Sequence, residues 1–186
     1  MKRLILILCM LMCSVSTISS SGLLSLYLNL LEKLNDGQKR VLVDSYTYGK
    51  NFDLGYTLAA IAWKESNFGM YMTNLGDGKY GSYGVFHILL DHAIVRHNIK
   101  ATNKWNKSRL VERLIFDFDF SAQEAIGQLE YWKNKFKNKE NTLAWAIAGY
   151  NAGNKGLDSS KGQSYRTDVK YKIRALEIYM AKNKLI

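Results

Sequence analysis

Residues 54–68 read LGYTLAAIAWKESNF, and the prediction of the fold starts here. Apolar and small residues dominate as far as Lys64, which predicts a helix from Leu54 to Glu65 with Asp53 as its N-cap. At the end of such a helix, burial and the negative pole of the helix dipole both disfavour a carboxylate. We therefore expect a raised pKa for Glu65, which suits it to donate a proton near neutral pH. The alternative is a solvated Glu in a last helical turn, the usual situation of this residue type.

The remaining patterns are typical of a mainly α protein with one domain. Between Gly69 and Gly84, glycines alternate with Tyr71, Tyr80 and Tyr83, which predicts a loop or a short hairpin. Ser121 with Glu124 resembles a capping box, and Asn141-Thr142 opens a later helix. Helical spacing predicts further helices over 23–34, 38–48, 89–98, 121–136, 143–150 and 167–182.

The first residues have the pattern of an export signal. Lys2 and Arg3 precede an apolar run from Leu4 to Met12, and mostly small residues follow from Ser14 to Gly22. We expect residues 1–20 to be a cleaved signal peptide and residues 21–186 to form the mature domain. The protein would then be exported, to the periplasm or the cell wall. An uncleaved anchor is one alternative, although the apolar run is shorter than the ~20 residues of a membrane span. A lipoprotein is another, disfavoured because Met12 before Cys13 is bulkier than a lipoprotein signal peptidase usually accepts.

The charge and the cysteines restrict the partners and the chemistry. The formal net charge is +10, about +8 without Lys2 and Arg3, which favours an anionic partner such as a cell-wall polymer or a membrane surface. Nucleic acid is disfavoured because the basic residues are scattered and no recognition motif accompanies them. Alternatively, the charge only aids solubility. Cys9 and Cys13 both lie in the leader, so a mature chain has no thiol nucleophile and no Cys-ligated zinc.

Two segments further along the chain give Glu65 a context. They are Gly84-Val-Phe-His-Ile88 and Ala148-Gly-Tyr-Asn-Ala-Gly153. With Glu65-Ser66 they form an ordered triplet that resembles the soluble lytic transglycosylase (SLT) family of the goose-type lysozyme-like superfamily. That family has Glu-Ser at a helix end, then Gly-Leu-Met-Gln-Ile, then Ala-x-Tyr-Asn-Ala-Gly. The resemblance implies a mainly α, lysozyme-like fold with the Gly/Tyr-rich loop or hairpin lining the cleft.

The resemblance also implies an activity. It is that of a peptidoglycan lytic transglycosylase, which cleaves the β-1,4 bond between N-acetylmuramic acid (MurNAc) and N-acetylglucosamine (GlcNAc). Glu65 would be the general acid, and then the base that takes the proton of the attacking 6-hydroxyl, which leaves a 1,6-anhydroMurNAc end. The N-acetyl group of the substrate would replace the second carboxylate of ordinary glycosidases. No metal or cofactor is implied. The partners are glycan strands, and small enzymes of this kind open the wall for secretion, conjugation or phage passage.

Further residues of the triplet are expected to contact the glycan. Gly84 would let the backbone approach a sugar, with Val85 or Phe86 as an apolar wall. The Tyr150 hydroxyl would bond to Glu65 or to the substrate N-acetyl group, unless residues 150–153 are only a core Tyr with a helix C-cap. Tyr165 matches a late tyrosine of the family only loosely. The full set of expected substrate-binding residues is Ser66, Tyr83, Gly84, Val85, Phe86, His87, Tyr150 and Asn151.

The segment departs from the family at Phe86-His87, where Met-Gln is usual. His87 can form the hydrogen bonds of a Gln, and its titration near neutral pH would add a pH dependence. A metal site made of His87, His92 and His97 is disfavoured, because five-residue steps on a helix turn these side chains apart.

Several alternatives stay open. Asp77 or Asp91 across from Glu65 would allow a lysozyme-type muramidase that activates water. The other classes are a non-catalytic peptidoglycan-binding module and a basic protein that disrupts walls or membranes without catalysis. Aromatic side chains can stack on sugar rings, although Trp63 and Trp145 at helical positions favour the core. The aromatic candidates are Trp63, Tyr71, Tyr80, Tyr83 and Trp145.

Overall fold

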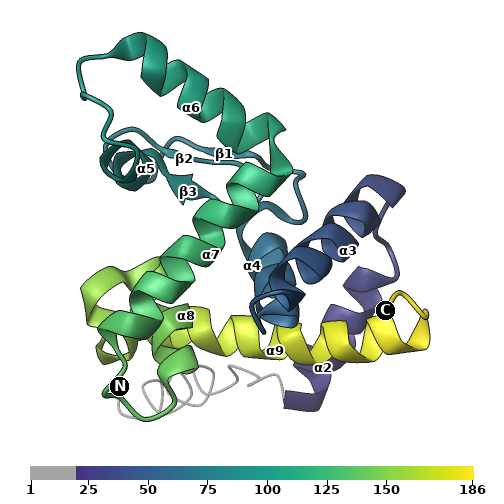
Figure 1. Cartoon of the computed structure of the whole chain (residues 1–186). Helices are drawn as coiled ribbons and strands as arrows, with labels where there is room; N and C mark the ends of the chain where they lie inside the picture. The colour runs from purple at the N-terminus through teal and green to yellow at the C-terminus, as the bar shows by residue number, and fades with distance from the viewer. Residues whose placement is uncertain (1–19) are drawn as a thin grey trace, which may run out of the picture.

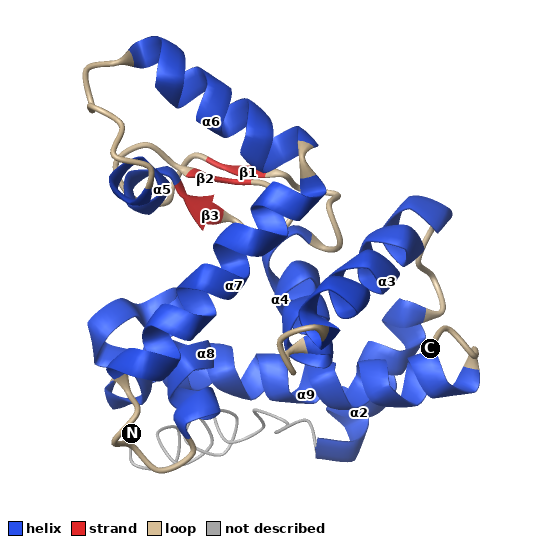
Figure 2. Cartoon of the chain, viewed as in Figure 1, coloured by secondary structure: helices blue, strands red, loops and turns tan. Residues whose placement is uncertain are grey.

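The computed structural model describes residues 20–186, which form a mainly α domain with one small sheet (Figures 1 and 2). The predicted signal peptide lies, apart from Ser20, outside these residues. None of the helices within 20–186 combines the length and the apolar character that a bilayer crossing requires. The helices are α2 (Ser20–Leu31), α3 (Asp36–Lys50), α4 (Gly55–Ser66), α5 (Leu90–Arg96), α6 (Lys104–Phe116), α7 (Phe118–Lys135), α8 (Thr142–Ala152), the 3-10 helix η1 (Gly153–Asp158) and α9 (Ser160–Lys182).

The elements group into two lobes joined by α7 (Figure 1). The small lobe holds α5, α6 and the antiparallel sheet β1-β2-β3, whose strands are Thr73–Asn74, Ser82–Tyr83 and Ile88–Leu89. The large lobe holds α2, α3, α4, α8, η1 and α9. This arrangement confirms the expected lysozyme-like helical domain. The strands β1 and β2 lie in the predicted Gly/Tyr-rich segment, and β3 follows it.

The helix α4 lies in the centre of the large lobe, against α3 and α9. Residues 57–63 along it are all buried, so no face of this stretch meets solvent. Ala59, Ala60 and Ala62 have small side chains, which lets neighbouring backbones approach closely. A helix that is apolar on every side is stable only when it is enclosed, which is why its sequence identifies the core.

Three boundaries differ from the predictions. Asp53 is not the N-cap of α4: it has φ +57°, and Leu54 takes the cap position without a side-chain bond. Ser121 and Glu124 do not form a capping box, because α7 begins earlier and Asp117 Oδ1 accepts from Phe120 N at 3.0 Å. The last helix begins at Ser160, where Ser159 Oγ accepts from Gly162 N at 3.1 Å. The cap at Asn141 is confirmed, since its side chain accepts from Ala144 N.

Candidate functional site

Glu65 lies one residue before the end of α4, and its side chain is 14% exposed. The chain turns sharply here because Asn67 adopts a left-handed conformation with φ +51°. The neighbouring Ser66 fixes this turn: its hydroxyl donates to Ala62 O at 3.1 Å and accepts from Gly69 N at 2.8 Å. Ser66 is fully buried, so its side chain holds Glu65 in place and is not open to a ligand.

Two side chains reach the Glu65 carboxyl group from distant parts of the chain. The Tyr165 hydroxyl, on α9, donates to Glu65 Oε1 at 2.5 Å. His87 Nδ1 lies 3.6 Å from Glu65 Oε2, and the His87 side chain is 9% exposed. The acid therefore has one partner on each oxygen.

The backbone and the ring of His87 are both constrained. Its φ is +46°, an uncommon conformation for a residue other than glycine, and such strain concentrates at functional sites. Nε2 lies 2.7 Å from the carbonyl oxygen of Tyr71. Because a carbonyl only accepts, Nε2 carries a proton, and Nδ1 is the ring nitrogen that faces Glu65.

The electrostatics agree with the expected acid. Burial raises the pKa of Glu65, and it outweighs the Tyr165 hydrogen bond and the charges of His87 and Lys64, which lower it. The negative charge of Asp77 adds to the rise. Burial and the nearby Glu65 hold the pKa of Tyr165 well above its usual value, so Tyr165 remains a donor.

Tyr150 lies beside the acid but does not bond to it. Its hydroxyl donates to Phe86 O at 2.8 Å, and Gln128 Nε2 donates to the carbonyl of Tyr150 at 3.1 Å. Tyr150 is buried, and burial with the nearby Glu65 raises the pKa of its hydroxyl. It therefore connects α8 to the segment that carries His87, and Tyr165 makes the contact with Glu65 that we expected of Tyr150.

In the structure, Gly84, Val85 and Phe86 have packing roles. Val85 and Phe86 are buried in the core. Gly84 has φ +83°, and a Cβ there would lie 2.1 Å from the carbonyl oxygen of Leu114. The glycine thus allows α6 to approach the segment, which is a different close approach from the predicted one to a sugar.

Tyr83 and Asn151 are half-buried, at the ends of β2 and α8. The Tyr83 hydroxyl donates to the Tyr80 carbonyl at 3.0 Å.

The two candidate second carboxylates are held in different ways. Asp77 Oδ2 accepts from Ser82 Oγ at 2.8 Å, and its charge acts on Glu65. Asp91 Oδ2 accepts from Lys79 N at 2.8 Å, which ties it to the sheet loop. Asp77 is therefore the stronger candidate for a second acidic group.

The other histidines have separate surroundings. His97 Nε2 lies 2.8 Å from Glu124 Oε1, and Arg96 also pairs with Glu124. Among residues 20–186, no group of three or more His, Cys, Asp or Glu side chains is arranged to hold a metal ion.

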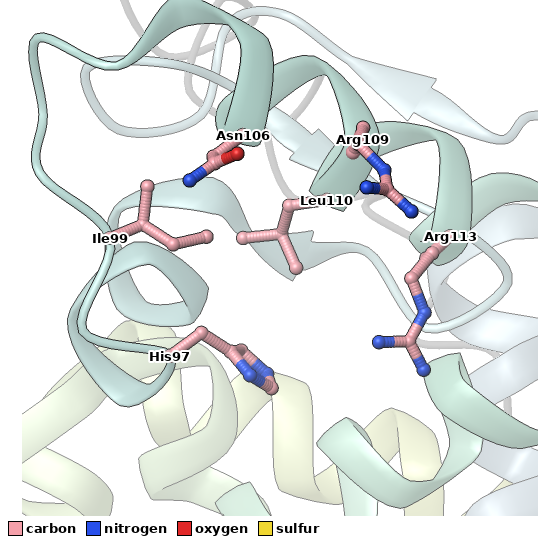
Figure 3. Close-up of a pocket in the computed structure, with 6 residues that line it drawn as sticks. All are labelled: His97, Ile99, Asn106, Arg109, Leu110 and Arg113. Atoms are coloured by element: carbon pink, nitrogen blue, oxygen red, sulfur yellow. The ribbon is translucent and has the colours of Figure 1, made fainter.

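Two hollows flank the Arg96–His97–Glu124 cluster. The first, of about 360 Å³, lies between α5, α7 and η1; its lining includes Tyr131, Trp132 and Asn154. The buried indole N–H of Trp132 has no hydrogen-bond partner within the described part of the chain. The second, of about 200 Å³, lies between the end of α5 and α6 (Figure 3). Arg109 and Arg113 reach into it from α6, and His97 lies opposite.

The comparison with sequence profiles of protein families identifies one family. The sequence profile described as "Transglycosylase SLT domain" matches residues 42–173. A protein of Enterobacteria phage T4, described as an uncharacterized 20.7 kDa protein in the vs-regB intergenic region, is 29% identical over 133 residues. The aligned part covers 72% of this chain and 66% of the phage protein, just under two thirds of its length. No solved structure matches the chain.

Proposed function

Because the chain belongs to the transglycosylase SLT domain family, we propose that it is a peptidoglycan lytic transglycosylase with Glu65 as its catalytic acid and base. The bond cleaved is the β-1,4 linkage between MurNAc and GlcNAc. The observation that carries this proposal is the buried Glu65 carboxyl group, which has a raised pKa and a tyrosine donor on one oxygen.

In the first step, Glu65 protonates the glycosidic oxygen while the bond from that oxygen to the anomeric carbon breaks. A protonated carboxyl group is needed, and the raised pKa increases the protonated fraction of Glu65 at a given pH. The carbonyl oxygen of the substrate N-acetyl group stabilises the anomeric carbon, in the place of a protein nucleophile.

In the second step, Glu65 is a carboxylate and takes the proton of the 6-hydroxyl, whose oxygen attacks the anomeric carbon. Glu65 thereby regains its proton and the product is a 1,6-anhydro sugar, with no water consumed. Tyr165 donates to Oε1 in both states, which stabilises the carboxylate between the steps and leaves Oε2 for proton transfer.

A long glycan needs contacts beyond the reacting bond. The hollow of about 360 Å³ between the lobes is lined by the exposed ring of Tyr131, the largely buried Trp132 and the amide of Asn154. Gln128 lines the same hollow and bonds to Tyr150, which connects the hollow to the surroundings of Glu65. Sugar rings stack on such aromatic faces, so this hollow supports a polymeric substrate.

A lysozyme-type muramidase is the second candidate, favoured by one observation. The charge of Asp77 acts on Glu65, so a second carboxylate is present in the neighbourhood. In that mechanism Asp77 would activate water, and hydrolysis would produce a reducing MurNAc end.

E65Q tests the acid that both candidates share, and D77N separates the two. E65Q removes the acid in either mechanism, so we expect lysis of purified sacculi to fall at least about 10³-fold. In the transglycosylase mechanism D77N should keep more than about a third of the wild-type rate, because Asp77 is not the base. In the muramidase mechanism D77N removes the general base and should lower the rate about 10²-fold or more. Lysis by E65Q at the wild-type rate would contradict the assignment of the acid. A wild-type protein that releases no soluble muropeptides would instead favour a binding module or a basic wall- or membrane-disrupting protein, and dye release from liposomes identifies the latter.

The cellular setting is also a proposal. Residues 1–20 have the signal pattern, so we propose export to the periplasm or the cell wall, where peptidoglycan lies. The phage T4 relative makes wall opening during phage infection one role to test, beside secretion and conjugation.

A further inference from the structure

A cluster of charged groups lies beside the candidate site where α2, α4 and α9 meet. Asp168, on α9, accepts hydrogen bonds from Lys64 Nζ at 2.6 Å, from Lys172 Nζ at 2.7 Å and from the Tyr27 hydroxyl. Lys172 Nζ also lies over the Tyr27 ring, 4.2 Å from its centroid. The side chains of Asp168 and Lys172 are 17% and 9% exposed, so the cluster is largely out of solvent.

Two members of the cluster, Lys64 and Asp168, lie close in the chain to residues of the candidate site. Lys64 directly precedes Glu65, and Asp168 follows Tyr165 by one helical turn on α9. The end of α4 is thus joined to α9 by two parallel contacts, Glu65 to Tyr165 and Lys64 to Asp168. A shift of α9 that opened one contact would strain the other.

The charge of Lys64 bears directly on the acid. Lys64 favours the carboxylate form of Glu65 and so lowers its pKa. Asp168 offsets this cation at 2.6 Å. Burial alone would raise the pKa of Asp168, but its bonds to Lys172, Lys64 and Tyr27 hold it below the usual value, so Asp168 stays negative at neutral pH.

Stability is a weak explanation for this arrangement. Buried ion pairs lose hydration on folding, and packed apolar side chains of similar size often stabilise a fold as well or better. The neighbouring site residues, Glu65 and Tyr165, offer a more specific explanation for the cluster.

We propose that Asp168 is a positioning residue for the acid: it holds Lys64 against α9, which fixes the Glu65–Tyr165 contact and offsets the cation beside Glu65. This inference rests on the proposed function. The other titratable groups that act on Glu65 are Tyr165 from α9, Tyr150 from α8, and His87 and Asp77 from the sheet segment. All of these are unchanged in the variants below.

The test is the pH dependence of kcat on soluble glycan strands at low salt. D168N alone would leave Lys172 buried without its carboxylate, so the main variant is D168N/K172M, which conserves net charge. Lys64 then acts on Glu65 without an offset, and we expect the alkaline limb of kcat to move to lower pH, with a loss of about threefold on that limb. High salt should shrink the shift, because Lys64 is partly exposed.

Two controls separate positioning from a structural role. K172M disrupts the same cluster but keeps the Lys64–Asp168 pair, so its alkaline limb should coincide with that of the wild type. K64M removes the cation, so its limb should move to higher pH. Identical profiles for D168N/K172M and K172M would overturn the proposal.

If D168N/K172M fails to fold, as circular dichroism would show, K64M decides the matter: an unshifted K64M limb overturns the proposal. A wild-type protein that releases no anhydro products would instead refute the proposed function, which is a separate outcome.

Discussion

At the scale of single residues, Glu65 has to be understood through its two partners. Tyr165 and His87 each face one oxygen of the carboxyl group, from elements 100 and 22 positions away in the chain. The sequence drew attention to Glu65 and His87 because both lie in motifs, and the structure brings their side chains together. Tyr165 matched the family only loosely, and it lies in a polar stretch where no helix was predicted. Its role depends on the position of α9, which no local pattern contains.

Glu65 should make the folded protein less stable at alkaline pH. Its pKa is raised by burial, so the folded state binds this proton more tightly than the unfolded state. The favourable contribution is complete below the unfolded pKa and is lost as the pH rises through the folded pKa. We therefore expect E65Q to raise the melting temperature by a few degrees at pH 8 and to leave it nearly unchanged at pH 4, as measured by thermal unfolding. An equal gain at both pH values would argue against a buried, titrating Glu65.

His87 should shift the pH dependence of catalysis. A positive charge on its ring lowers the pKa of Glu65, so H87Q, which restores the usual family residue, removes this effect. We expect the alkaline limb of kcat to move to higher pH in H87Q, while kcat at the optimum stays within about threefold, since Gln preserves a hydrogen-bonding side chain. The measurement is a pH–rate profile with H87A as control, which lacks that side chain. An unchanged limb in H87Q would mean that His87 does not act on the acid.

At the scale of elements, burial determined which helices could be predicted. The helices α4 and α8 have apolar residues on most faces, and both were predicted close to their observed bounds. The helix α6 was not predicted, because only Leu110 and Leu114 are buried in a polar, basic sequence. The first turns of α9 were missed for the same reason, since residues 160–166 read SKGQSYR. Tertiary packing stabilises these segments where local pattern is weak.

The segment before His87 should be sensitive to any side chain at position 84. G84A places a Cβ 2.1 Å from the Leu114 carbonyl oxygen at φ +83°, so both overlap and backbone strain oppose it. We expect G84A to lower the free energy of unfolding by about 3 kcal/mol or more, measured by urea denaturation. The matched control is G127A, because a Cβ at this helical glycine of α7 has nothing within 4 Å. It should stabilise by about 0.5–1 kcal/mol. Equal effects would contradict the close approach of α6 to Gly84.

At the scale of the whole molecule, the two lobes and the positive charge both suit an extended anionic polymer. The +10 formal charge was apparent from composition, but its distribution on the surface was not. In the structure, Arg109 and Arg113 reach into the small-lobe hollow of Figure 3, with Ile99 and Leu110 as its apolar lining. Only folding brings α5 and α6 together there, so the sequence could not predict this site.

This hollow should contribute to wall binding through charge. We expect R109Q/R113Q to weaken co-sedimentation with purified sacculi several-fold at low salt. At 0.5 M salt the variant should match the wild type, because the Debye screening length falls to about 4 Å. The control is K33Q/R40Q, which removes the same charge at exposed positions of the large lobe. Equal loss in both variants would indicate that net charge, and not the hollow, attracts the wall.

The central claim is that a single carboxylate, Glu65, directs an intramolecular attack by the 6-hydroxyl. Its most direct test is the mass spectrum of peptidoglycan digested by the wild-type protein in water enriched in ¹⁸O. The account predicts muropeptides lighter than hydrolysis products by one water, with no ¹⁸O at the new end. Reducing-end products that carry ¹⁸O would contradict it and would assign the chain to lysozyme-type hydrolysis.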